Sequence, residues 1–222
     1  MWPVLFNLGS VKITVFGLYL IVALLWPSFY IWRKLRSEAT SNEIFEFTLY
    51  LFAMVLSGGI LAHFVDDGKL GISGWGAVVV GVFALLWWCR RKKWDFWEHF
   101  DWLSVLGLLA WFWGGLAYGP GAATGVAGAL VSLLVVGIVR SNYRRFRWYP
   151  SGRMGIVGLI CLVCWSLYEI SVAMVGNHRV YWGGLTAGQI VAAWVLAYVI
   201  VAIYLRGGGK LSWTKRTMSV RN

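Results

Sequence analysis

Charged residues, and acidic ones above all, are scarce in this 222-residue chain. Asp and Glu together number 9, and charged residues make up 13% of the sequence, whereas a soluble domain carries about 25%. Hydrophobic residues make up 59%, which is more than a soluble protein of this size can bury. These values exclude a soluble globular domain. They also exclude a disordered chain, because disorder requires low hydrophobicity and high charge.

Cysteine is also rare, and the three cysteines exclude a secreted disulfide scaffold. Cys161 and Cys164 are closely spaced, but no second thiol pair or histidine cluster lies near them in the sequence, so we predict no zinc site. We interpret the cysteines as structural. The chain also lacks a P-loop, a G-x-G-x-x-G motif and an H-E-x-x-H motif. We therefore predict neither a metal ion nor a cofactor.

Long apolar stretches dominate what is present. A bilayer crossing needs about 20 apolar residues, and seven stretches approach or reach that length. Their uniform apolarity does not fit the alternating pattern of membrane β-strands. We predict an all-α polytopic membrane bundle of about seven transmembrane helices, forming one integral membrane domain over residues 1–222. The stretches are Ile13–Trp32, Phe47–Val65, Gly71–Cys89, Trp102–Tyr118, Gly121–Val139, Gly155–Val175 and Thr186–Leu205.

Basic residues follow alternate apolar stretches. Of the 20 Lys and Arg residues, 17 lie on one predicted side, and only Lys12, Lys69 and Arg179 lie on the other. The positive-inside rule then predicts an outside N-terminus, a cytoplasmic C-terminus and a basic cytoplasmic tail over residues 206–222. The net charge of +11 is explained by this topology. We therefore predict a multi-pass plasma-membrane protein with no nucleic-acid partner.

Three residues are candidates for catalysis. Glu169 lies within a predicted span, where an ionisable group costs about 2.5–3.5 kcal/mol at the centre and marks a functional candidate. The alternative is a protonated or hydrogen-bonded structural glutamate near the interface. His63 and His178 lie on the predicted outer side, and an imidazole there could deprotonate a thiol or hydroxyl group.

Other polar side chains on the predicted outer side are candidates for binding substrate. Lysine and arginine could hold a phosphate group, and hydroxyl and amide groups could hydrogen-bond a substrate. The alternative is that short outer loops are polar whatever their function. The candidate binding residues are Arg179, Lys69, Ser73, Tyr118 and Gln189.

Several short segments occur along the chain in a characteristic order. Residues 3–9 form a Pro-x-x-Phe-x-Leu-Gly segment, followed by Phe16-Gly17-Leu18, Ser57-Gly58-Gly59, Ser73-Gly74, Asp101, Glu169 and Gly188-Gln189-Ile190. In this order they resemble the phosphatidylglycerol–prolipoprotein diacylglyceryl transferase family. That family has a Gly-Gly pair in its second span, a Glu in its penultimate span and a Gly-Gln pair opening its last span.

The resemblance includes departures at charged positions. Ser73 lies where the family has the histidine of His-Gly-Gly. Ile60 and Trp165 lie where the family has arginines. The family's G-R-x-G-N-F signature has no counterpart, because residues 102–139 contain no Arg, Asn, Asp or Glu.

The resemblance implies transfer of a diacylglyceryl group from phosphatidylglycerol, or another anionic phospholipid, to the lipobox cysteine of a prolipoprotein. The reaction would occur at the outer face of a bacterial plasma membrane. His63 or His178 would be the base, Glu169 would orient the substrate, and Lys69 or Arg179 would hold the phosphate. One alternative, suggested by the missing arginines, is a catalytically inactive relative that binds lipid or a membrane partner. A second alternative is a small transporter or channel.

Overall fold

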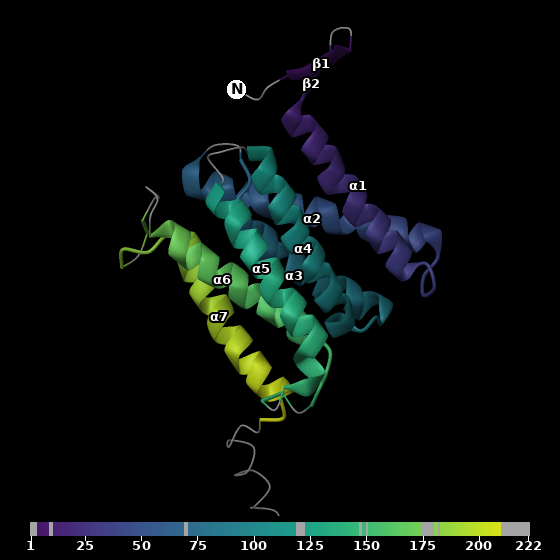
Figure 1. The fold of residues 1–222 in the computed structure, drawn as a ribbon, viewed down its shortest axis with the longest axis vertical. Helices are drawn as coiled ribbons and strands as arrows, with labels where there is room; N and C mark the ends of the chain where they lie inside the picture. The colour runs from purple at the N-terminus through teal and green to yellow at the C-terminus, as the bar shows by residue number, and fades with distance from the viewer. Residues whose placement is uncertain are drawn as a thin grey trace, which may run out of the picture.

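The computed structural model describes residues 4–8, 11–68, 71–118, 123–146, 148–149, 151–174, 180–181 and 183–209. These ranges hold seven α-helices, one short 3-10 helix and a two-stranded hairpin (Figure 1). The strands are β1 (Val4–Leu8) and β2 (Val11–Thr14). The helices are α1 (Val15–Leu35), α2 (Ser41–Asp67), α3 (Gly74–Lys92), α4 (Phe96–Tyr118), α5 (Ala123–Asn142), η2 (Tyr143–Arg145), α6 (Ile156–Ala173) and α7 (Ala187–Arg206).

The predicted helical bundle is confirmed, and each predicted apolar stretch corresponds to one helix. The helix starts differ from the predicted boundaries because polar caps, rather than the first apolar residue, set them. α2 begins after Thr40, whose hydroxyl accepts a hydrogen bond from the Glu43 backbone N–H while the Glu43 carboxylate accepts one from the Thr40 N–H. This reciprocal capping box extends the helix well before the apolar residues begin.

The hairpin was not predicted. β1 and β2 pair antiparallel, with Asn7 opposite Lys12 and Leu8 opposite Val11. Ile13 is predicted to lie in the first membrane span, whereas the structure places it in β2. The alternation of Val11 and Ile13 with Lys12 and Thr14 is a strand signal, but it is short and adjoins the apolar residues of α1, which is why the boundary was missed. The hairpin projects beyond the helices, and α1 leads from it to pack against α2 and α4 (Figure 1).

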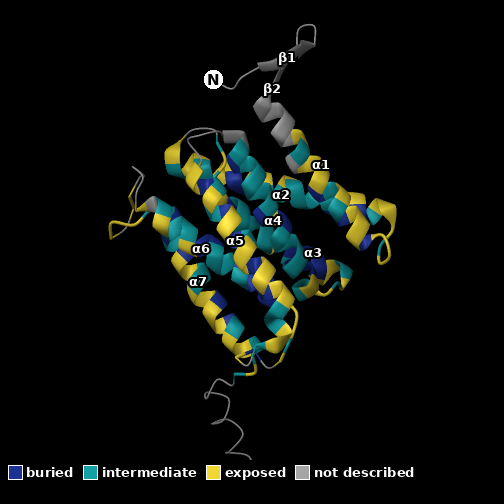
Figure 2. Ribbon diagram, viewed as in Figure 1, coloured by how far each residue is buried: buried dark blue, intermediate teal, exposed yellow. Residues whose placement is uncertain are grey.

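Three of the described helices are long and apolar enough to cross a membrane: α2, α7 and the helical segment Ala123–Arg145, which includes α5. α6 is a shorter apolar helix. Exposed residues run along α5 and α7 (Figure 2). They include large apolar residues such as Leu134 and Trp194. Such surfaces require lipid rather than water around them. The chain is therefore a helical membrane protein, while seven crossings and an outside N-terminus stay predictions.

Glycines set the close approach of α2 and α3. A Cβ atom at Gly76 would lie 2.2 Å from the Cβ of Ala62 and 2.3 Å from the carbonyl oxygen of Gly58. Small residues allow membrane helices to pack backbone against backbone in this way. At the next residue, the Gly59 carbonyl accepts a hydrogen bond from the Ser73 N–H at 2.9 Å. The Gly58-Gly59 pair therefore fixes where α3 begins.

Asp101, which lies on α4, forms hydrogen bonds with the start of α6. Its carboxylate accepts hydrogen bonds from the backbone N–H groups of Gly155 at 2.7 Å and Gly158 at 2.8 Å. These N–H groups lie at the start of α6, where backbone N–H groups have no acceptor within the helix. A charged acceptor also favours the positive end of the helix dipole. Asp101 is therefore the N-terminal cap of α6, supplied across the bundle.

We expect Asp101→Ala to destabilise the fold by about 1.5–3 kcal/mol, because two buried N–H donors would lose a charged acceptor. Asp95→Ala is the matched control. Asp95 caps its own helix α4 in an exposed position, accepting from the Trp97 and Glu98 N–H groups, so its loss should cost about 1 kcal/mol. Thermal unfolding in detergent measures both values. Equal destabilisation by the two variants would contradict the cross-bundle role of Asp101.

Candidate active site

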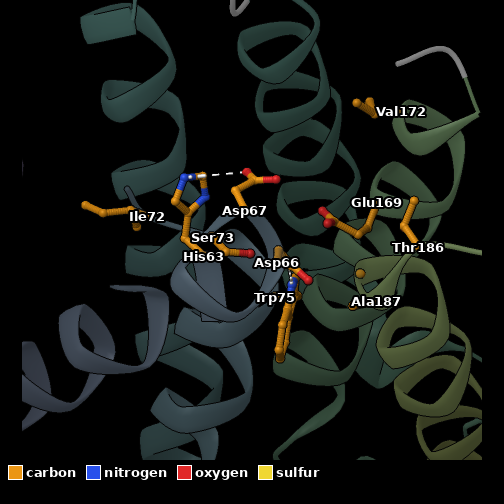
Figure 3. Close-up of a pocket in the computed structure, with 11 residues that line it drawn as sticks. His63, Asp66, Asp67, Ile72, Ser73, Trp75, Glu169, Val172, Thr186 and Ala187 are labelled. Atoms are coloured by element: carbon orange, nitrogen blue, oxygen red, sulfur yellow. Dashed lines mark hydrogen bonds and ion pairs between the residues drawn. The ribbon is translucent and has the colours of Figure 1, made fainter. Parts of the chain in front are cut away.

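A pocket of about 240 Å³ lies where four helix ends meet. The C-terminal end of α2, the N-terminal end of α3, the C-terminal part of α6 and the N-terminal end of α7 form its walls (Figure 3). These ends are opposite the basic helix termini at Arg33–Lys34 and Arg90–Lys92. The lining residues are His63, Asp66, Asp67, Ile72, Ser73, Trp75, Glu169, Val172, Thr186, Ala187 and Gly188.

His63 and Asp67 form an ion pair on one wall of the pocket. They lie one turn apart on α2, with 3.6 Å between the His63 Nε2 and the Asp67 Oδ2. The imidazole stands over Gly71, where an added Cβ would lie 2.3 Å from the ring. A carboxylate beside one ring nitrogen fixes the orientation of the ring. The pair can therefore act as an oriented base.

Asp66 is held in place by its neighbours. The Trp75 indole Nε1–H donates to the Asp66 Oδ2 at 2.8 Å. The Tyr181 hydroxyl donates to the backbone carbonyls of Val65 and Asp66 at 3.3 and 3.4 Å. These contacts join the end of α2 to α3 and to the segment before α7. The wall that carries His63 is thus positioned by hydrogen bonds from two other parts of the chain.

Glu169 lies on the opposite wall, on α6, and its carboxylate points toward Asp66 and Asp67 (Figure 3). It reaches the start of α7 at Gly188, where an added Cβ would lie 2.5 Å from the Glu169 Oε1. The N-terminal end of a helix carries partial positive charge, which favours an ionised carboxylate there. Gly188 therefore leaves the space in which the Glu169 carboxylate sits beside α7.

We expect Gly188→Ala to displace the Glu169 carboxylate while lowering stability by less than about 1 kcal/mol, because the end of a glutamate side chain can move. The diacylglyceryl transfer expected from the family resemblance should fall at least about tenfold, because the carboxylate would no longer be held in position. A double-mutant cycle measures the coupling. In a Glu169→Ala background, Gly188→Ala should have no further effect on activity, and an undiminished effect there would contradict this explanation.

The structure brings some of the candidate residues together. His63, Ser73 and Glu169 all line the pocket. Ser73 precedes α3 without a side-chain capping bond, so its hydroxyl is available to the pocket. The Tyr118 backbone ends α4, but its side chain is outside the described part of the structure. Lys69, His178 and Arg179 also lie outside the described residues.

Gln189 has a different position from the one expected of a binding residue. Its side-chain oxygen accepts from the Thr186 N–H at 3.0 Å, and its own N–H donates to the Thr186 hydroxyl at 3.2 Å. Its amide nitrogen donates to the Ile170 carbonyl at 3.3 Å. Gln189 is buried and joins the start of α7 to α6. It supports the wall that holds Glu169.

Asp66, Asp67 and Trp75 line the pocket but were not among the site residues selected from the sequence. The i, i+4 spacing of His63 and Asp67 on one helix was a signal that could have paired them. Trp75 gave no comparable signal, because its contact with Asp66 depends on how α2 and α3 meet. Trp165, one turn before Glu169, is 7% exposed, and its Nε1 would lie 3.9 Å from a Cβ at Gly74. It packs beneath the pocket.

The described pocket lining is acidic. It contains the carboxylates of Asp66, Asp67 and Glu169 together with His63, and none of its described residues is a lysine or arginine. Within the described ranges, no group of three or more His, Cys, Asp or Glu side chains is arranged to hold a metal ion. The site can therefore accept and relay a proton, while charge compensation for an anionic substrate needs cations from adjoining segments.

Comparison with known protein families gives a match over the first half of the chain. A family model described as prolipoprotein diacylglyceryl transferase matches residues 3–118, just over half of the chain. No curated protein matches the chain. The matched region spans the hairpin and α1–α4, and so includes His63, Asp67 and Ser73. Glu169 and the start of α7 lie beyond it, so the pocket combines matched and unmatched parts of the chain.

Proposed function

Because the chain belongs to the prolipoprotein diacylglyceryl transferase family, we propose that it transfers a diacylglyceryl group from phosphatidylglycerol to the lipobox cysteine of a prolipoprotein. The observation that carries this proposal is the His63–Asp67 pair facing Glu169 across the pocket. A thiol is a weak nucleophile until it loses its proton, and a nearby base supplies that step. The proposed place of reaction is the outer face of a bacterial plasma membrane.

His63 is the proposed general base. With Nε2 paired to Asp67, Nδ1 takes the proton of the cysteine thiol. The thiolate then attacks the glyceryl carbon that bears the phosphate oxygen. A C–S bond forms, the C–O bond breaks, and the oxygen leaves with the electron pair as glycerol phosphate. Asp67 stabilises the imidazolium that results, and Glu169 orients the substrate from the opposite wall.

The leaving phosphate requires positive charge. Lys69 follows Asp67 by two residues, and Arg179 precedes Tyr181 by two residues. Tyr181 in turn hydrogen-bonds the backbone at Val65 and Asp66 beside the pocket. In the proposed mechanism, Lys69 and Arg179 hold the phosphate, with Arg179 favoured for bidentate contact. They would take the place of the family arginines that correspond to Ile60 and Trp165.

The second candidate function is lipid binding without turnover. The three carboxylates in the described pocket lining disfavour turnover, because they oppose the negative charge that develops on the leaving phosphate. Lipid binding without turnover is also favoured by Trp165, a buried indole where the resemblance places an arginine. In this case the chain would bind phospholipid or a membrane partner, and the pocket would not release glycerol phosphate.

A mass-spectrometric assay separates the two candidates. The full chain in phosphatidylglycerol nanodiscs is incubated with a lipobox peptide, and with a matched peptide in which serine replaces the cysteine. The transferase proposal predicts a diacylglyceryl adduct on the cysteine peptide and none on the serine peptide. Folded, lipid-bound protein that gives no adduct at any lipid or peptide concentration would leave the binding role in its place.

A further inference from the structure

The connection between α5 and α6 is strongly basic and has no acidic residue near it in the sequence. Residues 102–168 contain no Asp or Glu, yet residues 140–155, called here the arginine loop, contain five arginines. This loop lies at the end of the bundle opposite the pocket, where the basic helix ends are also found. Four of its arginines are described: Arg140, Arg144, Arg145 and Arg153.

These four arginines are exposed and lack carboxylate partners within the described residues. The ion pairs found there are His63–Asp67 and Lys92–Glu43, and neither involves the arginine loop. By contrast, the basic end of α3 is partly neutralised, since Lys92 contacts Glu43 at 2.9 Å. Asp101 contacts the end of the loop through the Gly155 N–H, but it forms no ion pair with these four arginines. The described arginines of the loop therefore present positive charge that is not neutralised by ion pairs within the described residues.

Aromatic side chains accompany the charge. Trp148 is 55% exposed, and its ring stacks on Phe146 with the centroids 5.1 Å apart. An exposed tryptophan beside arginines is typical of the headgroup level of a bilayer, where the indole has both apolar and polar neighbours. The loop thus combines a cationic surface with an aromatic anchor at the same depth.

The described part of the loop is anchored by hydrogen bonds and by a buried side chain. Tyr149 is buried, and its hydroxyl donates to the Arg153 carbonyl at 3.0 Å. The Ser151 hydroxyl donates to the Arg206 carbonyl, and the Arg206 guanidinium donates to the Met154 carbonyl. These bonds attach the loop to the end of α7. The arginines are therefore displayed from an ordered segment, which lowers the entropy lost on binding.

We propose that the arginine loop binds the headgroup of an anionic phospholipid in the leaflet that faces it. Arg144, Arg145 and Arg153 contact the phosphate, and Trp148 lies against the headgroup and upper acyl region. The shared chemistry of guanidinium and phosphodiester favours bidentate contacts. The aromatic anchor and the bundle's apolar faces favour a membrane lipid over free phosphate. This lipid would be bound rather than consumed, at a site separate from the pocket.

Native mass spectrometry of the full chain in detergent tests the proposal. Phosphatidylglycerol or phosphatidylcholine is titrated, and the lipid retained per protein is measured. The test variant is Arg144→Gln/Arg145→Gln/Arg153→Gln. The control variant, Arg33→Gln/Lys34→Gln/Arg36→Gln, removes the same charge from the end of α1 on the same side. Each lysine or arginine near an anionic lipid surface raises the affinity for that surface about fivefold.

The expected result is at least about a tenfold loss of phosphatidylglycerol retention in the loop variant and less than about a threefold loss in the control. Phosphatidylcholine retention should be unchanged in both. Trp148→Ala, which keeps every charge, should weaken phosphatidylglycerol retention in an otherwise folded protein. Equal losses in the loop and control variants would overturn the proposal. Displacement of the lipid by millimolar inorganic phosphate would also overturn it.

Discussion

His63→Gln is expected to lower the rate of diacylglyceryl transfer by about 10²–10⁴-fold, the usual contribution of a general base. The glutamine amide can still reach Asp67, so the wall of the pocket should stay in place while the proton acceptor is lost. Binding of phosphatidylglycerol should therefore change little. The measurement is the single-turnover rate of adduct formation on a lipobox peptide, compared with lipid retention by the same preparation.

The matched control is His99→Asn. His99 is buried on α4, away from the pocket lining, and its Nδ1 lies 2.7 Å from the Asp95 carbonyl. An asparagine amide can replace that donor, so transfer per folded molecule should stay within about threefold of the unsubstituted protein. A His63→Gln protein that transfers at the original rate would show that another group takes the thiol proton.

Gly76→Ala is expected to lower the free energy of unfolding by about 1–3 kcal/mol, the usual cost of overpacking. The added Cβ would meet the Cβ of Ala62 at 2.2 Å and the Gly58 carbonyl oxygen at 2.3 Å. Neither group is the end of a flexible side chain, so α2 and α3 must move apart. Because these helices carry His63 and Ser73, transfer should fall together with stability. Thermal unfolding in detergent gives the stability change.

Gly137→Ala is the control for this effect. Gly137 is an exposed residue of α5, and nothing lies within 4 Å of a Cβ added there. Alanine is favoured over glycine within a helix by up to about 1 kcal/mol, so this variant should be neutral or slightly more stable. If both alanine variants unfold at the same temperature, the glycine contact between α2 and α3 does not limit the packing.

The helices could be predicted from the sequence because apolar length is a strong signal in a membrane protein. Their starts could not be, since Thr40 and Asp95 extend α2 and α4 through local hydrogen bonds that hydropathy does not detect. The hairpin before α1 was missed for a related reason. In β2 the apolar Val11 and Ile13 alternate with the polar Lys12 and Thr14, but this short strand signal adjoins the apolar residues that continue into α1.

The candidate site was predicted in part. His63 and Ser73 were selected as polar residues on the predicted outer side, and Glu169 as an ionisable residue within a predicted span. The structure places all three around one pocket. The contact of Trp75 with Asp66 and the space at Gly188 depend on how helices far apart in the sequence meet. Such contacts follow from tertiary packing and not from local spacing. Gln189 was selected for its polarity, but its side chain caps α7.

The most direct test of the proposed transferase function is to quantify both products in the same reaction. The full chain in phosphatidylglycerol nanodiscs receives a lipobox peptide, and the thioether peptide and the released glycerol phosphate are measured together. The proposed displacement predicts equal amounts of the two products, each dependent on the cysteine thiol. The proposed transferase function would be contradicted if glycerol phosphate were released without thioether peptide. It would also be contradicted if folded, lipid-bound protein formed neither product.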